Sequence, residues 1–165
     1  MKKIIIILSI ISILFIVNNK NEIVIPKESI RFRIIANSNT FEDQSLKNII
    51  KKDLINNVFS TLPNNYNKSK NLIINSIPLI ENTLNKYNIK YNINFGNNYF
   101  PEKKYKGITY PSGNYESLVI TLDRGLGDNF WCVMYPPLCL VEQDNDYNNI
   151  EYKSFIKEIL DKYNT

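Results

Sequence analysis

The spacing of apolar residues changes from a period of two to a period of three to four early in the chain, and this change restricts the fold most. Residues 30–36 (IRFRIIA) alternate and then run apolar, which predicts a β-strand. Either Thr40 with Asp43 or Asn39 with Glu42 forms a capping box, so a helix is expected to begin there. The expected apolar face of this helix holds Leu46, Ile49, Ile50, Leu54 and Val58.

Further apolar patterns follow in the order helix, strands, helix. Residues 73–87 have helical spacing, and because proline disfavours a helix interior, Pro78 predicts either a kink or a helix start near Ser76. Strands are expected at residues 90–95, 117–122 and 130–134, and residues 96–114 are expected to form a loop with one short strand. The last helical face holds Tyr152, Phe155, Ile156, Ile159, Leu160 and Tyr163. This order predicts an α+β fold, a small mostly antiparallel sheet with about three helices packed on one face.

The N-terminus resembles an export signal. Lys2 and Lys3 precede an apolar run over residues 4–17, which as a helix reaches roughly 21 Å against a hydrocarbon core of about 30 Å. No pair of small residues follows the run, so residues 1–20 are expected to be either a cleaved signal peptide or an N-terminal membrane anchor. Residues 21–29 then form a linker and residues 30–165 a single domain, which the two lysines would place outside the cytoplasm.

Two features of the composition limit the possible functions. The chain has no histidine, which excludes Ser-His-Asp and Cys-His catalysis and His-ligated zinc. Residues 21–165 hold 17 basic and 16 acidic side chains without a basic block, so nucleic-acid binding has little support.

The two cysteines, Cys132 and Cys139, either pair outside the cytoplasm or stay reduced in buried strands, and their geometry decides which.

Three patterns that resemble ligand sites are better explained structurally. Gly125 and Gly127 lack a third glycine and a following helix, so a hairpin turn is favoured over a phosphate loop. Residues 144–155 open like a calcium loop but lack the sixth-position glycine and the final glutamate, so an acidic lead-in to the last helix is favoured. No cofactor or metal is therefore expected. A hydrolase would need a pair of carboxylates, and the candidates are Glu102, Glu116, Asp123, Asp128 and Glu142, which no spacing pairs.

Two segments resemble one protein family. Residues 30–47 (IRFRIIANSNTFEDQSLK) are similar to the R-x-R-x-x-A-x-S-D…D-Q-x-L-K opening of the stage II sporulation protein R family. Residues 113–118 and 125–139 (GLGDNFWCVMYPPLC) are similar to that family's G-x-Y-x-A-L…G-x-G-x-N-W-W-C-V-x-F-P-P-L-C pattern. Asn39 departs from this pattern, because an aspartate is usual at that position.

The resemblance implies a secreted, non-enzymatic signalling protein of endospore-forming bacteria. Such proteins are exported into the space between forespore and mother cell, where they bind and activate a membrane-bound aspartic protease that processes the precursor of sigma-E. Membrane contact through residues 4–17 is expected if the signal persists. The candidate partner-binding residues are expected on two surfaces. One is the polar turn with Asn37, Ser38, Asp43 and Gln44, and the other runs from the glycine turn to the Pro-Pro bend with Gly125, Gly127, Asn129, Trp131, Pro136 and Pro137. Arg31 and Arg33, which share one face of their strand, are further candidates.

Several alternatives stay open at this stage. Thr40 and Asp43 can simply cap a helix, and Arg31 and Arg33 can pair with acidic residues of the neighbouring helix as well as with a partner. Around Trp131 the strand residues are expected in the core and the two prolines at the surface. The rival functions are an exported hydrolase acting on the cell wall and a cell-wall or ligand-binding module.

Overall fold

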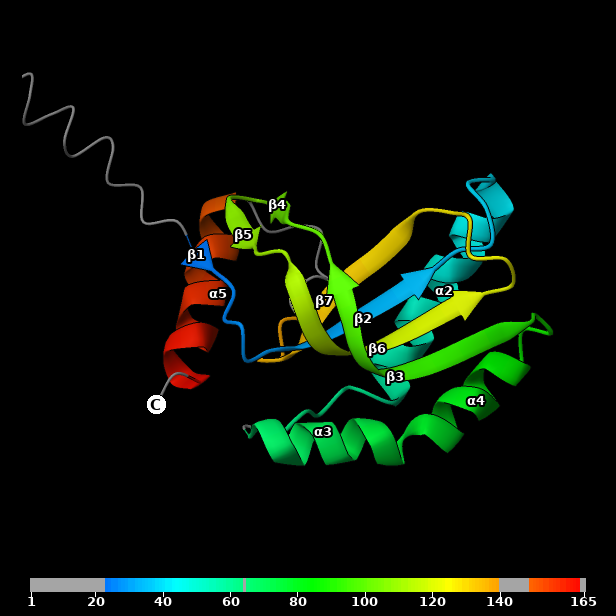
Figure 1. Cartoon of the computed structure of the whole chain (residues 1–165), viewed down its shortest axis with the longest axis horizontal. Coiled ribbons are helices and arrows are strands. Elements are labelled where there is room, and N and C mark those ends of the chain that lie inside the picture. Colours follow the sequence, from blue (N-terminus) through cyan, green and yellow to red (C-terminus); the bar gives the residue numbers. More distant parts are fainter. Residues whose placement is uncertain (1–22, 64, 140–148, 164–165) are drawn as a thin grey trace, which may run out of the picture.

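Two β-sheets and four helices make up the part of the chain that the computed structural model describes, namely residues 23–63, 65–139 and 149–163 (Figure 1). In chain order the elements are β1 (Ile23–Val24), β2 (Ile30–Ile35), α2 (Phe41–Asn57), α3 (Tyr66–Asn75), α4 (Ile77–Asn85), β3 (Tyr91–Phe100), β4 (Lys103–Tyr105), β5 (Ile108–Tyr110), β6 (Gly113–Leu122), β7 (Asn129–Tyr135) and α5 (Asn149–Tyr163). The predicted α+β class is confirmed. The predicted export segment, residues 1–20, and the acidic lead-in at 144–148 lie outside the described residues. Within those residues no helix has the length and apolar character needed to cross a membrane.

The larger sheet has four strands in the order β3-β6-β2-β7. Strand β6 pairs antiparallel with β3, and β7 pairs antiparallel with β2, but β2 and β6 run parallel. The sheet is therefore mixed, with antiparallel pairs in the majority. A parallel pair needs a long crossover connection, and the chain between β2 and β6 supplies it with α2, α3, α4 and β3. A smaller sheet has the order β1-β5-β4.

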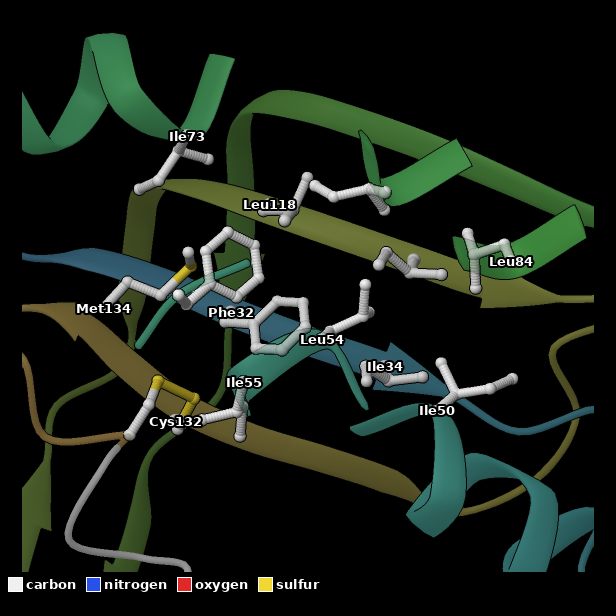
Figure 2. Close-up of a cluster of buried hydrophobic side chains, with 14 of the residues drawn as sticks. Phe32, Ile34, Ile50, Leu54, Ile55, Ile73, Leu84, Leu118, Cys132 and Met134 are labelled. Carbon is white, nitrogen blue, oxygen red and sulfur yellow. A yellow bond between two sulfur atoms is a disulfide. The ribbon is translucent and has the colours of Figure 1, made fainter. Parts of the chain in front are cut away.

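Helices α2, α3 and α4 cover one face of the larger sheet, whereas the last of the predicted helices, α5, was expected on this face and packs against the smaller sheet instead. Side chains that alternate along the strands meet the buried side chains of the helices in one apolar cluster (Figure 2). Phe32 lies in the middle of this cluster, with its ring 5.6 Å from that of Phe59 and 6.2 Å from that of Phe130. Among its members are Ile34, Ile50, Leu54, Ile55, Ile73, Ile80, Leu84, Leu118, Ile120, Cys132 and Met134.

A second apolar cluster joins α5 to the smaller sheet. Ile156 and Leu160 of α5 are buried with Ile25, Ile108 and further apolar side chains, and Val133 of β7 belongs to the same cluster. Figure 1 shows α5 beside β1 and β5, at the end of the molecule away from α4. Ile25 and strand β1 fall within the segment predicted to be a linker, and they pair with or pack against β5.

Two local predictions differ from the structure, and one of two alternatives is confirmed. Ile49 was expected on the buried face of the first helix but is 54% exposed, because α2 presents Ile50, Leu54 and Ile55 to the sheet instead. The predicted helix start near Ser76 is confirmed, because Ser76 is the N-cap of α4 and Pro78 lies in its first turn, where proline costs little, while residues 73–75 belong to α3. Residues 96–114 are mostly strand, since β3 continues to Phe100 and β4 and β5 follow.

Candidate functional site

Two loops from distant parts of the sequence form one hydrogen-bonded cluster at an end of the larger sheet. The loop at 37–40, with the first turns of α2, meets the turn between β6 and β7. The backbone N–H of Leu126 donates to the carbonyl of Asn37 at 3.0 Å, and the N–H of Asp128 donates to Oδ1 of Asn39 at 2.6 Å. We call residues 37–47 and 123–128 together the turn cluster.

Glycine is required twice in the turn cluster. A Cβ at Gly127 would lie well under 3.0 Å from the backbone carbonyl of Ser38, a distance that real Cβ atoms do not reach. The N–H of Gly127 also donates to the carbonyl of Ala36 at 2.9 Å. Gly125 has φ +63°, which L side chains rarely adopt, and its Cβ would collide with the side chain of Thr121. Gly127 therefore lets the two loops approach closely, and Gly125 permits the turn after β6.

Asp43 connects the loop to the start of α2. Its carboxylate accepts hydrogen bonds from Oγ of Ser38 at 2.5 Å and from Nδ2 of Asn37 at 2.9 Å. Thr40 is the N-cap, and its hydroxyl accepts from the N–H of Asp43, so the predicted Thr40–Asp43 cap is confirmed. The hydrogen bond from Ser38, with weaker ones from Asn37 and Thr40, holds the pKa of Asp43 below its usual value.

Gln44 and Lys47 extend the cluster across to the second loop. Nε2 of Gln44 donates to the carbonyl of Ser38 at 2.9 Å, and Nζ of Lys47 donates to Oε1 of Gln44 at 2.5 Å and to the carbonyl of Asp128 at 2.8 Å. Lys47 is buried, and this desolvation lowers its pKa. Lys47 lies in the first family-like segment, but the sequence indicated no role for it. Its contact with Asp128 joins residues that are far apart in the chain, and only the fold brings them together.

The outer side of the turn cluster exposes two large apolar side chains. Phe41 at the start of α2 is 82% exposed and Leu126 in the β6–β7 turn is 69% exposed. Large apolar side chains on a rigid backbone are typical of protein-binding surfaces.

Arg31 and Arg33 lie on the other face of the sheet, away from α2, α3 and α4. The guanidinium carbon of Arg31 lies 3.7 Å from the ring centre of Tyr115, and that of Arg33 lies 4.1 Å from the ring centre of Phe100. Burial lowers the pKa of both arginines. The alternative that they pair with acidic residues of the neighbouring helix is wrong, because α2 packs on the opposite face and aromatic rings cover the two side chains.

A hollow of about 210 Å³ opens beside Arg31 at the β7 edge of the sheet. The residues lining it are Arg31, Lys51, Phe100, Lys103, Tyr105, Tyr110, Asn129, Phe130, Trp131 and Cys132. We call it the aromatic hollow. The structure thus brings the predicted residues Arg31, Asn129 and Trp131 together there, and Arg33 lies beside them with its guanidinium carbon 5.3 Å from the ring centre of Trp131.

Sequence reasoning missed most of the remaining lining residues. Phe100, Lys103, Tyr105 and Tyr110 fall in the stretch expected to be mainly loop. The available signal was the high content of aromatic and lysine side chains over 99–106. Lys51 gave no signal, since a lysine on a helix surface is ordinary.

Pro136 and Pro137 lie at the opposite end of β7 from the turn cluster. The structure joins Cys132 to Cys139 in a disulfide, with 5.2 Å between the two Cα atoms (Figure 2). Inside this loop the N–H groups of Leu138 and Cys139 both donate to the carbonyl of Val133 at 3.0 Å. Pro136 is buried and Pro137 half-buried, so the expectation that both prolines lie at the surface is wrong. The loop folds back on β7, which places Pro136 against the protein.

The candidate residues therefore form three groups, because the structure joins the predicted polar turn to the glycine turn and separates both from the Pro-Pro bend. Asn37, Ser38, Asp43, Gln44, Gly125 and Gly127 belong to the turn cluster, Arg31, Arg33, Asn129 and Trp131 surround the aromatic hollow, and Pro136 and Pro137 lie in the disulfide loop. Strand β7 begins after the turn cluster, passes along the aromatic hollow and ends at the disulfide loop.

Comparisons with known proteins identify the family. The family model described as "Stage II sporulation protein R" matches residues 26–145, which include the turn cluster and every residue lining the aromatic hollow. A protein of Bacillus subtilis (strain 168) named "Stage II sporulation protein R" is 36% identical in an alignment of 132 residues that covers 74% of this chain and 58% of that protein. The chain thus spans just over half the length of this relative. No solved structure matches the chain. The chain belongs to the stage II sporulation protein R family.

Proposed function

We propose that this protein is an exported activator that binds a membrane-bound aspartic protease and thereby leads to processing of the sigma-E precursor in the mother cell. In this proposal the protein acts without catalysis of its own, from the space between forespore and mother cell. Membership of the family supports the sporulation part, and the charged lead before the apolar run at 4–17 supports export.

The turn cluster is the observation that carries the proposal. Its two loops come from both family-like segments, and hydrogen bonds tie them into one surface on which Phe41 and Leu126 are exposed. A surface that is ordered before binding loses little conformational entropy when a partner docks. A ligand shifts a protease toward its active arrangement only by binding that arrangement more tightly, and a rigid apolar surface can discriminate in this way.

The test is co-expression of the full chain with the protease and the sigma-E precursor in a host that does not sporulate. We expect the precursor to be cleaved only when this chain is present. Deletion of residues 4–17 is expected to abolish cleavage, because the chain would then stay in the cytoplasm. Cleavage that is equally fast without the chain, or with the deletion variant, would contradict the proposal.

Two leucine variants test the surface itself. Leu126→Ala removes an exposed side chain of the turn cluster, and Leu79→Ala removes a side chain of α4, outside the cluster, that is 49% exposed. We expect Leu126→Ala to slow cleavage about fivefold, the effect of losing roughly 1 kcal/mol of binding, and Leu79→Ala to leave it unchanged. Equal effects of the two substitutions would place the docking surface elsewhere.

A further inference from the structure

Strand β3 forms an edge of the larger sheet that lacks the usual protection against further pairing. Within the described residues its only neighbouring strand is β6 (Figure 1). Natural edge strands are commonly protected by charged side chains, by proline or by a β-bulge. Residues 91–100 (YNINFGNNYF) hold no charged residue and no proline, and they pair with β6 along the whole strand without a shift of register. An edge of this kind can accept another strand.

The first half of β3 directs hydrogen-bonding groups away from the sheet. The N–H of Asp123 donates to the carbonyl of Lys90 at 2.7 Å, so the backbone groups of Lys90 face β6. Because the backbone groups of an antiparallel strand alternate in direction, those of Tyr91, Ile93 and Phe95 face away from β6. Among the described residues, none bonds to these outward-facing groups. Each of the three residues therefore offers one N–H and one carbonyl to a partner strand.

The side chains of residues 91–95 follow a symmetric pattern. Tyr91, Ile93 and Phe95 are partly buried against the large apolar cluster, whereas Asn92 and Asn94 are exposed on the opposite face. The order aromatic, asparagine, isoleucine, asparagine, aromatic is the same in both directions of the chain. An antiparallel copy of this segment would therefore meet its own pattern.

A two-fold axis at Ile93 would place matching side chains opposite each other. Ile93 would face Ile93 of the second copy, Tyr91 would face Phe95, and Asn92 would face Asn94. The three outward-facing residues of each copy would then oppose one another and form about six backbone hydrogen bonds between the copies. Aromatic pairs and amide pairs at such positions stabilise a sheet.

We propose that two copies of this chain associate through β3, with residues 91–95 of one copy paired antiparallel with the same residues of the other. Strand addition of this kind supplies backbone hydrogen bonds, and the side chains set the register. The segment has no charge with which to select an acidic or a basic strand, but it matches its own sequence at every position. The nearest charge, on Lys90, would face Gly96 of the second copy, so no like charges meet. This inference goes beyond the proposed function, because it does not depend on protease activation.

Cross-linking tests this register. Asn92→Cys and Asn94→Cys each add one exposed thiol, and the two native cysteines are already joined in a disulfide. The two full-length variants are mixed in detergent micelles and mildly oxidised, and the covalent dimer is measured on a non-reducing gel. We expect the mixture to give at least about fivefold more dimer than either variant alone, because directly opposed residues lie within disulfide range and diagonal ones do not.

The control for the cross-linking is a mixture of Asn92→Cys with Asn97→Cys. Asn97 is also exposed on β3, but the proposed register does not place it opposite Asn92. This mixture should give no more dimer than the single variants. Association through the apolar run at 4–17 would not favour the mixture of Asn92→Cys with Asn94→Cys, so the comparison separates the strand from that run.

Lysine substitutions test the association without cross-linking. Asn92→Lys/Asn94→Lys would place lysines opposite lysines between the two copies, while in one copy both side chains stay exposed. Sedimentation equilibrium in density-matched detergent measures the protein concentration at which half of the chains are dimeric. We expect this concentration to rise at least about tenfold in the double variant. Asn56→Lys/Asn57→Lys, at exposed positions near the end of α2, is the matched control and should leave it unchanged.

Three results would overturn the inference. The first is a full chain that stays monomeric at every concentration, which would leave the β3 edge to a strand of another protein. The second is equal cross-linking in the two mixtures. The third is association of Asn92→Lys/Asn94→Lys as strong as that of the wild type, once circular dichroism has verified that the variant is folded. The co-expression test would be unaffected by any of these results.

Discussion

Position 127 has no room for a side chain, because the backbone of Ser38 passes directly over it. Asp43 in turn holds Ser38 and Asn37 through side-chain hydrogen bonds. Sequence reasoning explained Gly127 by its freedom in a turn, but the structure gives it a different reason, which is close approach of another loop. At the scale of single residues, the turn cluster thus depends on the absence of a side chain at Gly127 and on the carboxylate of Asp43.

Gly127→Ala is expected to lower the free energy of unfolding by about 1–3 kcal/mol, since a methyl group forces the two loops apart. The matched control is Gly96→Ala. Its Cβ would meet only the Oδ1 atom of Asn94 at 3.7 Å, an ordinary contact, so this variant should unfold like the wild type. Urea unfolding measures both. Equal midpoints for the two alanine variants would show that the approach of Ser38 is not constraining.

Asp43 predicts a dependence of stability on acid pH. Because the hydrogen bond from Ser38 lowers the folded-state pKa of Asp43, its charged form stabilises the fold above the unfolded pKa of about 3.9. This stabilisation is lost as the pH falls through the lower folded pKa. Asp43→Asn should therefore be less stable than the wild type at neutral pH, and the difference should shrink below about pH 4.

The control for Asp43 is Glu42→Gln, which removes one exposed carboxylate from the same helix turn. Denaturant midpoints measured from pH 2 to pH 7 should give a larger pH-dependent difference for Asp43→Asn than for Glu42→Gln. If the two variants follow the same curve, the helix dipole and not the Ser38 contact accounts for the effect.

Strand β7 is the element that connects the three groups of candidate residues. Cys132 and Met134 point into the core, while Val133 belongs to the second cluster with α5. The alternation of side chains could be predicted from residues 130–134. The position of β7 at the edge of the sheet could not be predicted. Whether a strand lies at the edge or in the centre depends on which distant strands pair with it, and the sequence of the strand itself does not show this.

Reduction of the Cys132–Cys139 disulfide is expected to lower the free energy of unfolding by about 2.5 kcal/mol, the chain-entropy value for a closed loop of eight residues. Urea midpoints with and without reductant measure this loss. The Cys132→Ser/Cys139→Ser double variant should be insensitive to reductant and as unstable as the reduced protein. A wild-type midpoint that reductant does not move would show that the bond adds nothing to the stability.

At the scale of the whole molecule, two apolar clusters stabilise different parts of the chain. The larger one holds α2, α3 and α4 on the four-stranded sheet, and the smaller one holds α5 on β1 and β5. The final helix was predicted correctly over residues 152–163, and Ile156 and Leu160 are buried as expected. The side chains of Tyr152 and Phe155 lie outside the described residues. The partner of this helix is a sheet of three short strands, and the sequence predicted only one short strand in the stretch that holds two of them, residues 96–114.

Ile156→Ala is expected to destabilise the smaller cluster by about 2–4 kcal/mol, because it leaves a cavity between α5 and β5. Hydrogen exchange should become faster at the amides of β5 while those of β2 and β6 stay protected, since the two clusters are separate. Lys157→Ala, at the next and exposed position, is the control. Equal acceleration in both sheets would mean that the molecule unfolds as one unit.

The sequence by itself determined the types of the main elements and the face of β2 that meets the helices. Its periods of two and of three to four are local properties, and burial of one face follows from them directly. It also determined the helix start at Thr40, where the capping residues are neighbours in the chain.

Only the tertiary structure decided what covers the other face of β2. Arg31 contacts Pro111, which lies 80 residues further along the chain, and Asn39 contacts Asp128 at a separation of 89. Local spacing carries no information about such pairs, because their formation depends on which strands pair and in which register. For this reason the sequence identified Arg31 and Trp131 as separate candidates, and only the fold shows that both line the same hollow.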